Sequence, residues 1–182
     1  MGKTYDVIDD RIKSWMSRQK MFFVATAPLG GDTLVNCSPK GRDTLRVLGP
    51  NVLAYMDGDG SGIETVAHIK ENGRIVIMLC AFEGPPKIYR FHGRGQVFEP
   101  HQEEFNSLRA EFPEGNCRAI IKISVTRILD SCGYGVPKYK YEGERKSHEN
   151  LMSRISPEEI EEYRDKNKFS LDKLPGLERC KG

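Results

Sequence analysis

The sequence predicts a mostly β fold in which antiparallel strands close into a small barrel that also carries helices. Short runs rich in β-branched and aromatic residues follow one another at turn-length gaps of Gly, Pro and Asp, which favours antiparallel pairing. Single helical patterns interrupt these runs. Gly93 and Gly95 lie inside one long strand pattern, where a bulge or bend lets a sheet curl into a barrel.

The amino-terminal part opens with an amphipathic helix expected over about residues 6–19, where apolar residues recur at helical spacing. Four short strands are expected to follow, at residues 21–27, 33–37, 44–48 and 51–57. A second helix is expected over residues 61–72, because an apolar side recurs there and Asn72-Gly73 is a natural stop.

The remaining elements are predicted from their periodicity. Residues 74–82 are apolar on both alternating faces, so we expect them to form the central strand, buried on both sides. Residues 87–98 alternate as a strand with one face toward solvent or a ligand. That face carries Arg90, His92 and Arg94, for which solvent exposure is the simpler interpretation. A surface helix over residues 101–112 and a last long strand over residues 117–129 complete the pattern.

Composition predicts one domain, residues 1–137, with a charged helical extension, residues 138–182, packed on it. The extension contains a helix opened by a Ser-Pro-Glu-Glu cap at residues 156–159. The 28 Lys and Arg residues nearly balance the 26 Asp and Glu residues, so neither nucleic acid nor an anionic membrane is an expected partner. No run is long and apolar enough to span a membrane, and no secretory signal opens the chain, so we expect the cytoplasm.

Two features of the sequence resemble metal-binding patterns, but neither has the ligands that a metal site needs. The stretch after Asp57 resembles an EF-hand loop, but His68 occupies the position where such a loop needs a bidentate Glu. The five cysteines are odd in number, widely spaced and free of any C-x-x-C, which argues against a zinc site or a disulfide framework. We therefore expect no metal and reduced thiols, including Cys180.

The turn before the second helix has two interpretations. Ser61-x-x-Glu64 matches a capping box, in which the two side chains satisfy the first amides of the helix. Alternatively, this glycine-rich helix start binds a phosphate through its unpaired amides and positive dipole end. Thr65 would add a hydroxyl donor. Lys40 or Arg42 would supply a cation from the loop after the strand at residues 33–37, which is expected to run beside residues 51–57.

The segments VNCSPKGRD and TVAHIKENGRIVIML, separated by a strand and a Ser/Gly turn, resemble the pyridoxamine 5′-phosphate oxidase-like family of FMN-binding split β-barrels. In that family a strand ending in Lys-Gly and a helix ending in Asn-Pro-Arg-Val frame the phosphate of FMN. Lys40-Gly41 matches the first element, and residues 72–75 match the last. The resemblance covers about residues 20–130, and CGYGVP at residues 132–137 also resembles one branch of the family.

This resemblance implies a Greek-key-like antiparallel barrel, FMN as the cofactor, and a homodimer with the cofactor at its interface. The implied cofactor-binding residues are Asn36, Cys37, Ser38, Lys40, Gly41, Ser61, Gly62, Thr65, Tyr134 and Pro137. The first three would line the ring or ribityl chain; Lys40, Ser61 and Thr65 would hold the phosphate. Tyr134 and Pro137 would cover the flavin ring.

The implied function is that of a flavin-dependent oxidoreductase acting on an unidentified small molecule, with no catalytic side chain assigned. Ile63, Glu64 and Thr65 stand where pyridoxamine phosphate oxidases carry Ser-Arg-Lys, and residues 174–182 lack their Arg- and Trp-containing segment. The resemblance therefore implies FMN binding without naming a substrate. A non-enzymatic flavin- or haem-binding module, or an F420-dependent reductase, are the alternatives.

Overall fold

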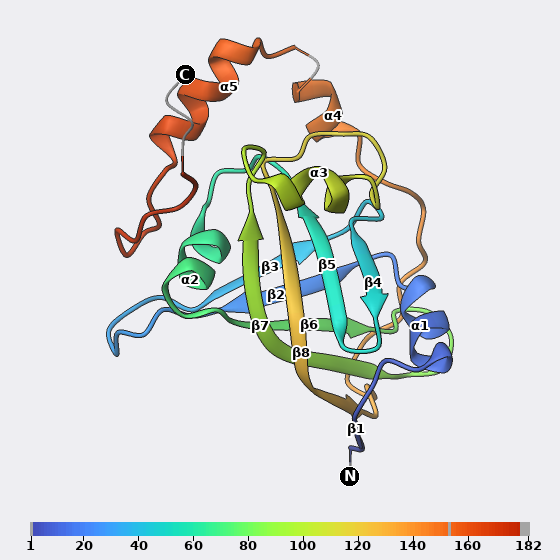
Figure 1. Cartoon of the computed structure of the whole chain (residues 1–182). Helices are drawn as coiled ribbons and strands as arrows, with labels where there is room; N and C mark the ends of the chain where they lie inside the picture. Colours follow the sequence, from blue (N-terminus) through green and yellow to red (C-terminus); the bar gives the residue numbers. More distant parts are fainter. Residues whose placement is uncertain (1, 153, 179–182) are drawn as a thin grey trace.

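One antiparallel sheet organises the computed structural model, which describes residues 2–152 and 154–178 (Figure 1). Cys180 lies outside the described residues. The strands are β1 (Thr4–Tyr5), β2 (Phe22–Thr26), β3 (Asn36–Lys40), β4 (Leu45–Gly49), β5 (Val52–Asp57), β6 (Arg74–Cys80), β7 (Ile88–Phe98) and β8 (Ala119–Ser131). The helices are α1 (Asp10–Ser17), α2 (Glu64–Asn72), α3 (Glu103–Arg109), α4 (Ser147–Met152) and α5 (Pro157–Lys166).

The sheet is open between two strands that are neighbours in sequence. Its order is β3-β2-β6-β7-β8-β5-β4, with β1 added beside β8. Every pairing is antiparallel, and β8 lies between β7 and β5. The sheet curls so that its two edge strands, β3 and β4, approach each other without pairing. The predicted mostly β, antiparallel split barrel is confirmed.

The core fills the inside of the curled sheet because inward and outward side chains alternate along each strand. Phe22 and Val24 of β2 and Ile77 of β6 point inward and are buried. Helix α1 adds Ile12 and Met16 to the same cluster, and α2 adds Val66 and Ile69. Both predicted amphipathic helices therefore pack their apolar sides on the barrel.

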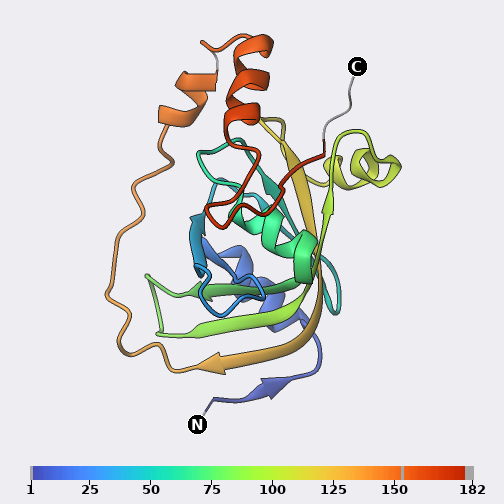
Figure 2. The ribbon, with the colours of Figure 1, turned by 90° about the vertical axis from the view of Figure 1, so that its left-hand side faces the viewer.

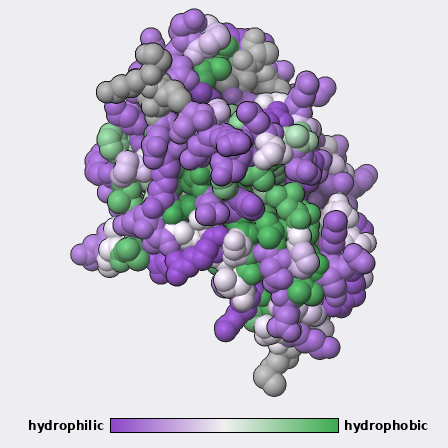
Figure 3. Space-filling model, in the orientation of Figure 1, coloured by the Kyte–Doolittle hydropathy of each residue, from purple (hydrophilic) through white to green (hydrophobic). Residues whose placement is uncertain are grey.

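The outer side of the sheet also carries apolar residues. Phe23 pairs with Pro39 on one side and Met78 on the other, and Ala25 pairs with Val76 in the next row. Pro39 is exposed, and the other four side chains are only partly buried. We call this surface the outer face; it consists of Phe23, Ala25, Pro39, Val76 and Met78, and Arg90 of β7 borders it next to Met78. Elsewhere on the molecule, Figure 3 shows hydrophobic side chains across the middle of the visible face, between hydrophilic ones.

The bend predicted at the glycines of β7 is confirmed. The register between β7 and β8 shifts at His92/Gly93, which marks a bulge. A Cβ atom at Gly93 would overlap the backbone carbonyl of Ser124, so the two strands approach more closely than a side chain allows. Arg90, His92 and Arg94 lie on the outer side of β7, as the alternation predicts.

Two strand predictions are wrong in detail. The strand expected at residues 33–37 is β3, three residues later, so Lys40 ends the strand instead of following it. This strand pairs with β2, and β4 occupies the place beside β5 where the strand was expected. The central strand is β7, and β6 is its neighbour. Residues of β6 alternate between buried and half-buried because its outer side lies on the outer face.

The chain after β8 runs back along the barrel and over its open side (Figure 2). The ring of Tyr139 packs at a tilt against Phe82 with centroids 5.4 Å apart, and the backbone amide of Tyr139 donates to the Phe82 carbonyl at 3.1 Å. The predicted cap at Ser156 is confirmed, since its side chain accepts from Glu159 in a reciprocal capping box.

Candidate functional site

A groove of about 2130 Å³ lies where the sheet is open. One wall is β3 with the hairpin after it, which contributes Asn36, Ser38 and Lys40. The opposite wall is formed by residues 58–62 of the β5–α2 loop and by the start of α2. Residues 139–145, here called the rim segment, border the groove from outside. The groove exists because β3 and β4 do not pair, so the split of the barrel and the groove are one feature.

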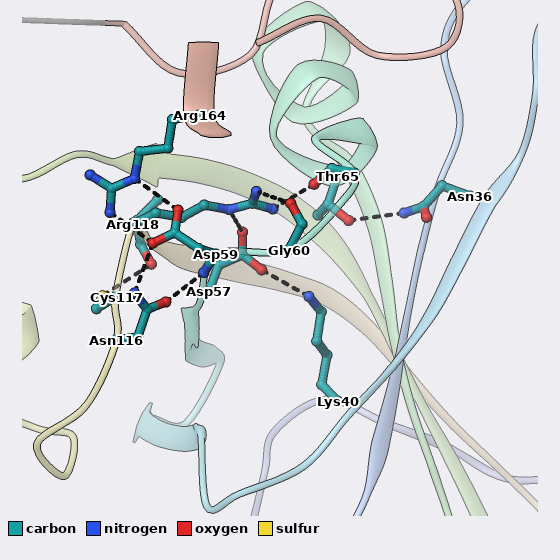
Figure 4. A network of polar contacts seen from close by, with 12 residues as sticks. Asn36, Lys40, Asp57, Asp59, Gly60, Thr65, Asn116, Cys117, Arg118 and Arg164 are labelled. Atoms are coloured by element: carbon teal, nitrogen blue, oxygen red, sulfur yellow. Dashed lines mark hydrogen bonds and ion pairs between the residues drawn. The ribbon is translucent and has the colours of Figure 1, made fainter. Parts of the chain in front are cut away.

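A buried carboxylate joins the two walls. Asp57, at the end of β5, is fully buried and contacts Lys40 Nζ at 2.8 Å and Arg118 Nε at 2.9 Å (Figure 4). Burial alone would raise the pKa of Asp57, but the two cations outweigh burial and lower it. Asp57 is therefore ionised, and the three side chains together carry one net positive charge, two cations against one anion.

Arg118 also shapes the β5–α2 loop. Its guanidinium donates to the carbonyl oxygens of Gly60 at 3.4 Å and Gly62 at 2.8 Å. Two loop carbonyls are thereby satisfied from inside the protein. Sequence reasoning missed Arg118, because no local pattern links it to Asp57. Only the pairing of β5 with β8, which sets Asp57 opposite Ala119, brings them together.

The start of α2 is not capped by a side chain. The helix begins at Glu64, its N-cap residue is Ile63, and no side chain of the N-cap accepts a hydrogen bond. The predicted capping box of Ser61 and Glu64 is therefore wrong. Glu64 instead accepts a hydrogen bond from the backbone amide of Leu171 at 3.3 Å. An apolar N-cap leaves the first amides of the helix available to another acceptor.

A hydrogen-bonded set of side chains forms the floor of the groove. Asn36 Nδ2 donates to Thr65 Oγ1 at 2.9 Å and to Thr26 Oγ1 at 3.1 Å. Ser38 Oγ donates to Asn36 Oδ1 at 3.0 Å. Thr26 in turn lies 3.1 Å from Nδ1 of His68, which is fully buried. Asn36 is thus held by three partners, which fixes its amide at the groove.

His68, which occupies the last position of the EF-hand-like stretch, is a buried residue of α2 and contacts Thr26. Burial lowers the pKa of its imidazole, against the opposing effect of the acidic residues Asp172, Glu64 and Glu71. The ring is therefore neutral at physiological pH and supports the groove floor through Thr26. Within residues 2–152 and 154–178, no three His, Cys, Asp or Glu side chains lie close enough together to hold a metal ion.

The structure brings most of the predicted cofactor residues into the groove. Its lining includes Asn36, Ser38, Lys40, Gly41, Ser61, Gly62 and Thr65. Three predicted residues lie elsewhere: Cys37, Tyr134 and Pro137 do not line the groove of this chain. Cys37 points to the outer side of β3 because alternate residues of a strand face opposite ways. Tyr134 is 82% exposed on the loop after β8.

No protein-family model matches the chain. A pyridoxamine 5′-phosphate oxidase family protein of Aspergillus flavus, ustO, is 34% identical over 192 residues, which is 95% of this chain and 77% of that protein.

Solved structures share the fold. HupZ of Group A Streptococcus superposes with a TM-score of 0.56 at 23% identity, over 73% of this chain and 99% of HupZ. A candidate pyridoxamine 5′-phosphate oxidase of Lactobacillus delbrueckii gives 0.53 at 14% identity, over 68% and 94%. In the described part of the chain, every helix is too short or too polar to cross a lipid bilayer.

Proposed function

Since this chain belongs to the pyridoxamine 5′-phosphate oxidase family, we propose that it binds FMN noncovalently in the groove and acts as a flavin-dependent oxidoreductase on a small molecule. One observation carries the proposal: Lys40 and the uncapped start of α2 lie on opposite walls of the same groove. A cation and a set of uncapped helix amides that line the same groove can together bind a phosphate.

The charges of the groove fit a phosphate. Lys40 remains partly exposed, with 26% of its side chain accessible, although it contacts Asp57. The Lys40–Asp57–Arg118 cluster keeps one net positive charge next to the helix start. In this proposal the phosphate is held by Lys40, the amides of residues 61–65 and the hydroxyl of Thr65. Arg118 acts from behind, by holding the loop carbonyls away from the anion.

The remaining groove residues would orient the rest of the cofactor. Asn36 and Ser38 lie further along β3, on the same side of the strand as Lys40, and are suited to the ribityl chain. Bound FMN would supply the electron-accepting ring. The protein would place the ring and limit the access of water, and we assign no acid or base side chain. We also propose a cytoplasmic location, where exposed thiols such as those of Cys37 and Cys132 stay reduced.

We propose a homodimer built on the outer face. Monomeric proteins rarely leave a continuous apolar sheet surface uncovered. Phe23 and Ala25 of β2 form such a surface with Met78 and Val76 of the neighbouring strand β6. Cys37, Tyr134 and Pro137 lie outside the groove of their own chain, so they could contact a flavin only across this interface. A cofactor at the interface would then draw residues from both subunits.

Titration of the purified protein with FMN, followed by quenching of flavin fluorescence, tests cofactor binding. Saturable quenching at one site per chain is expected, and no quenching at any concentration would overturn the proposal. Anaerobic addition of NADH or NADPH then separates an enzyme from a storage module. If the protein is an oxidoreductase, the flavin absorbance should bleach when the reductant is added and recover when an electron acceptor is added. If it is a storage module, the flavin absorbance should stay unchanged with every reductant.

A further inference from the structure

Helix α5 and the segment after it contact the β5–α2 loop on the side opposite the groove. Residues 154–178, here called the arm, contain α5 and the segment that returns to α2 (Figure 2). Arg164 of α5 contacts Asp59 through Nε and a terminal nitrogen, both at 2.8 Å (Figure 4). This paired geometry fixes the direction of both side chains more firmly than a single contact does.

Asp59 is a rigid anchor for that contact. Its side chain is only 3% exposed, and Asn116 donates to Asp59 Oδ2 at 2.8 Å. The Asn116 side chain also accepts from the backbone amide of Asp59 at 2.6 Å. Because Asp59 is part of the loop itself, Arg164 acts directly on the backbone that leads into α2.

Two further contacts hold the start of α2. The backbone amide of Leu171 donates to Glu64, and Gly176 lies so close to Ile63 that a Cβ atom there would overlap the Ile63 side chain. Leu177 packs against the core cluster that includes Ile63. Asp59, Ile63 and Glu64 are thus all held by the arm.

Helix α5 is held to the loop by this ion pair and not by buried apolar side chains. The helix has no buried residue, and a cavity of about 270 Å³ lies between it and the barrel. A helix without apolar burial gains little from packing. Its position therefore depends on Arg164 and on the ordered state of the loop that carries Asp59.

We infer that the arm is a positioning element for the phosphate site, and that cofactor binding and arm docking are coupled through Arg164 and Asp59. This inference rests on the proposed function. The arm touches the loop from behind and lines no part of the site assigned to the phosphate. If docking orders the loop amides, then a phosphate that needs those amides must in turn favour docking, because coupling between two sites is reciprocal.

The test compares Arg164→Gln with Lys166→Gln. Both substitutions remove one positive charge from α5, but the partner of Lys166 is Glu162 on the exposed surface of the same helix. We expect Arg164→Gln to weaken FMN binding about tenfold and Lys166→Gln to change it by less than about twofold. Arg164→Lys keeps the charge without the paired geometry and should fall between them.

Hydrogen exchange measured by mass spectrometry supplies a readout that a merely structural role would not move. Saturating FMN should slow amide exchange in residues 157–178 of the wild-type protein, and this protection should be smaller in Arg164→Gln. Should that variant fail to fold, Arg164→Lys and the wild-type exchange decide the matter.

The coupling alone would be overturned if Arg164→Gln and Lys166→Gln bound FMN with equal affinity. It would also be overturned if FMN left the rate of amide exchange in the arm of the wild-type protein unchanged. A wild-type protein that binds no FMN would overturn the proposed function and the coupling together.

Discussion

At the scale of single residues, Asp57 links the two walls of the groove. Its carboxylate is fully buried and contacts Lys40 from β3 and Arg118 from β8. A buried carboxylate without partners would be costly, so each cation is required by the fold as well as by the proposed site. The site therefore shares its charges with the structural ion pairs that hold the loop.

Lys40→Ala is predicted to weaken FMN binding by about 1.5 to 3 kcal/mol, because it removes a charge-assisted contact and the net positive charge of the cluster. Fluorescence titration measures this. Lys13→Ala, which removes an exposed lysine from α1, should leave the affinity unchanged. Equal affinity in wild type and Lys40→Ala would remove Lys40 from the cofactor site.

Asp130 is predicted to stabilise the fold in a pH-dependent way. Burial alone would raise its pKa, but hydrogen bonds from Lys87, the Lys3 amide and Tyr5 lower the pKa to about 2, from 3.8. A lowered pKa in the folded state means that the stabilisation is present above pH 3.8 and is lost as the pH falls toward 2.

Urea unfolding checks this expectation. Asp130→Asn should lower the free energy of unfolding by about 1 to 2 kcal/mol near neutral pH, and the gap from wild type should narrow below about pH 4. Asp32→Asn, in an exposed turn, serves as the control. A gap that stays constant down to about pH 2 would show that the charge of Asp130 is not its source.

The sequence identified much of the groove lining, and missed the residues that shape it. Asn36, Ser38 and Lys40 stand in one short motif, so a local pattern reveals them. Arg118 and Arg164 meet the loop only after folding, and each looks like an ordinary charged residue in its own segment. The capping box was wrong because the arm supplies Glu64 with another partner, the Leu171 amide.

At the scale of secondary-structure elements, the bulge in β7 determines how the sheet closes. Gly93 sits against the backbone of β8 where the register shifts. The glycine pattern predicted this bend from sequence alone. The shifted start of β3 was not predictable in the same way, because Pro39 lies in an edge strand, where a missing amide donor is tolerated.

Gly93→Ala is predicted to destabilise the protein by about 2 to 4 kcal/mol, because the added methyl group would overlap the Ser124 carbonyl. Gly31→Ala is the matched control, since a Cβ atom at that position meets nothing within 4 Å. Thermal unfolding of both variants measures the difference. Equal midpoints would mean that the strands can separate at the bulge without cost.

At the scale of the whole molecule, one sheet presents three surfaces. The inside forms the core, the open edge between β3 and β4 forms the groove, and the outer face remains available for a partner. Strand alternation predicts which residues face inward. It cannot predict which outward residues gather into one surface, because that depends on the register of β2, β6 and β7.

Met78→Lys is predicted to convert the proposed dimer to a monomer, because the substitution places a charge in the middle of the outer face. Sedimentation velocity measures the mass. Ser107→Lys, on the exposed side of α3, should leave the assembly unchanged. A dimer that persists in Met78→Lys would assign the interface to another surface.

The central claim concerns a phosphate held between Lys40 and the start of α2, and it is tested most directly by comparing the affinities of FMN and riboflavin. These ligands share the ring and the ribityl chain and differ only in the phosphate. We predict that FMN binds at least about tenfold more tightly than riboflavin, and that Lys40→Ala narrows the difference. Equal affinity of the wild-type protein for both ligands would contradict the claim.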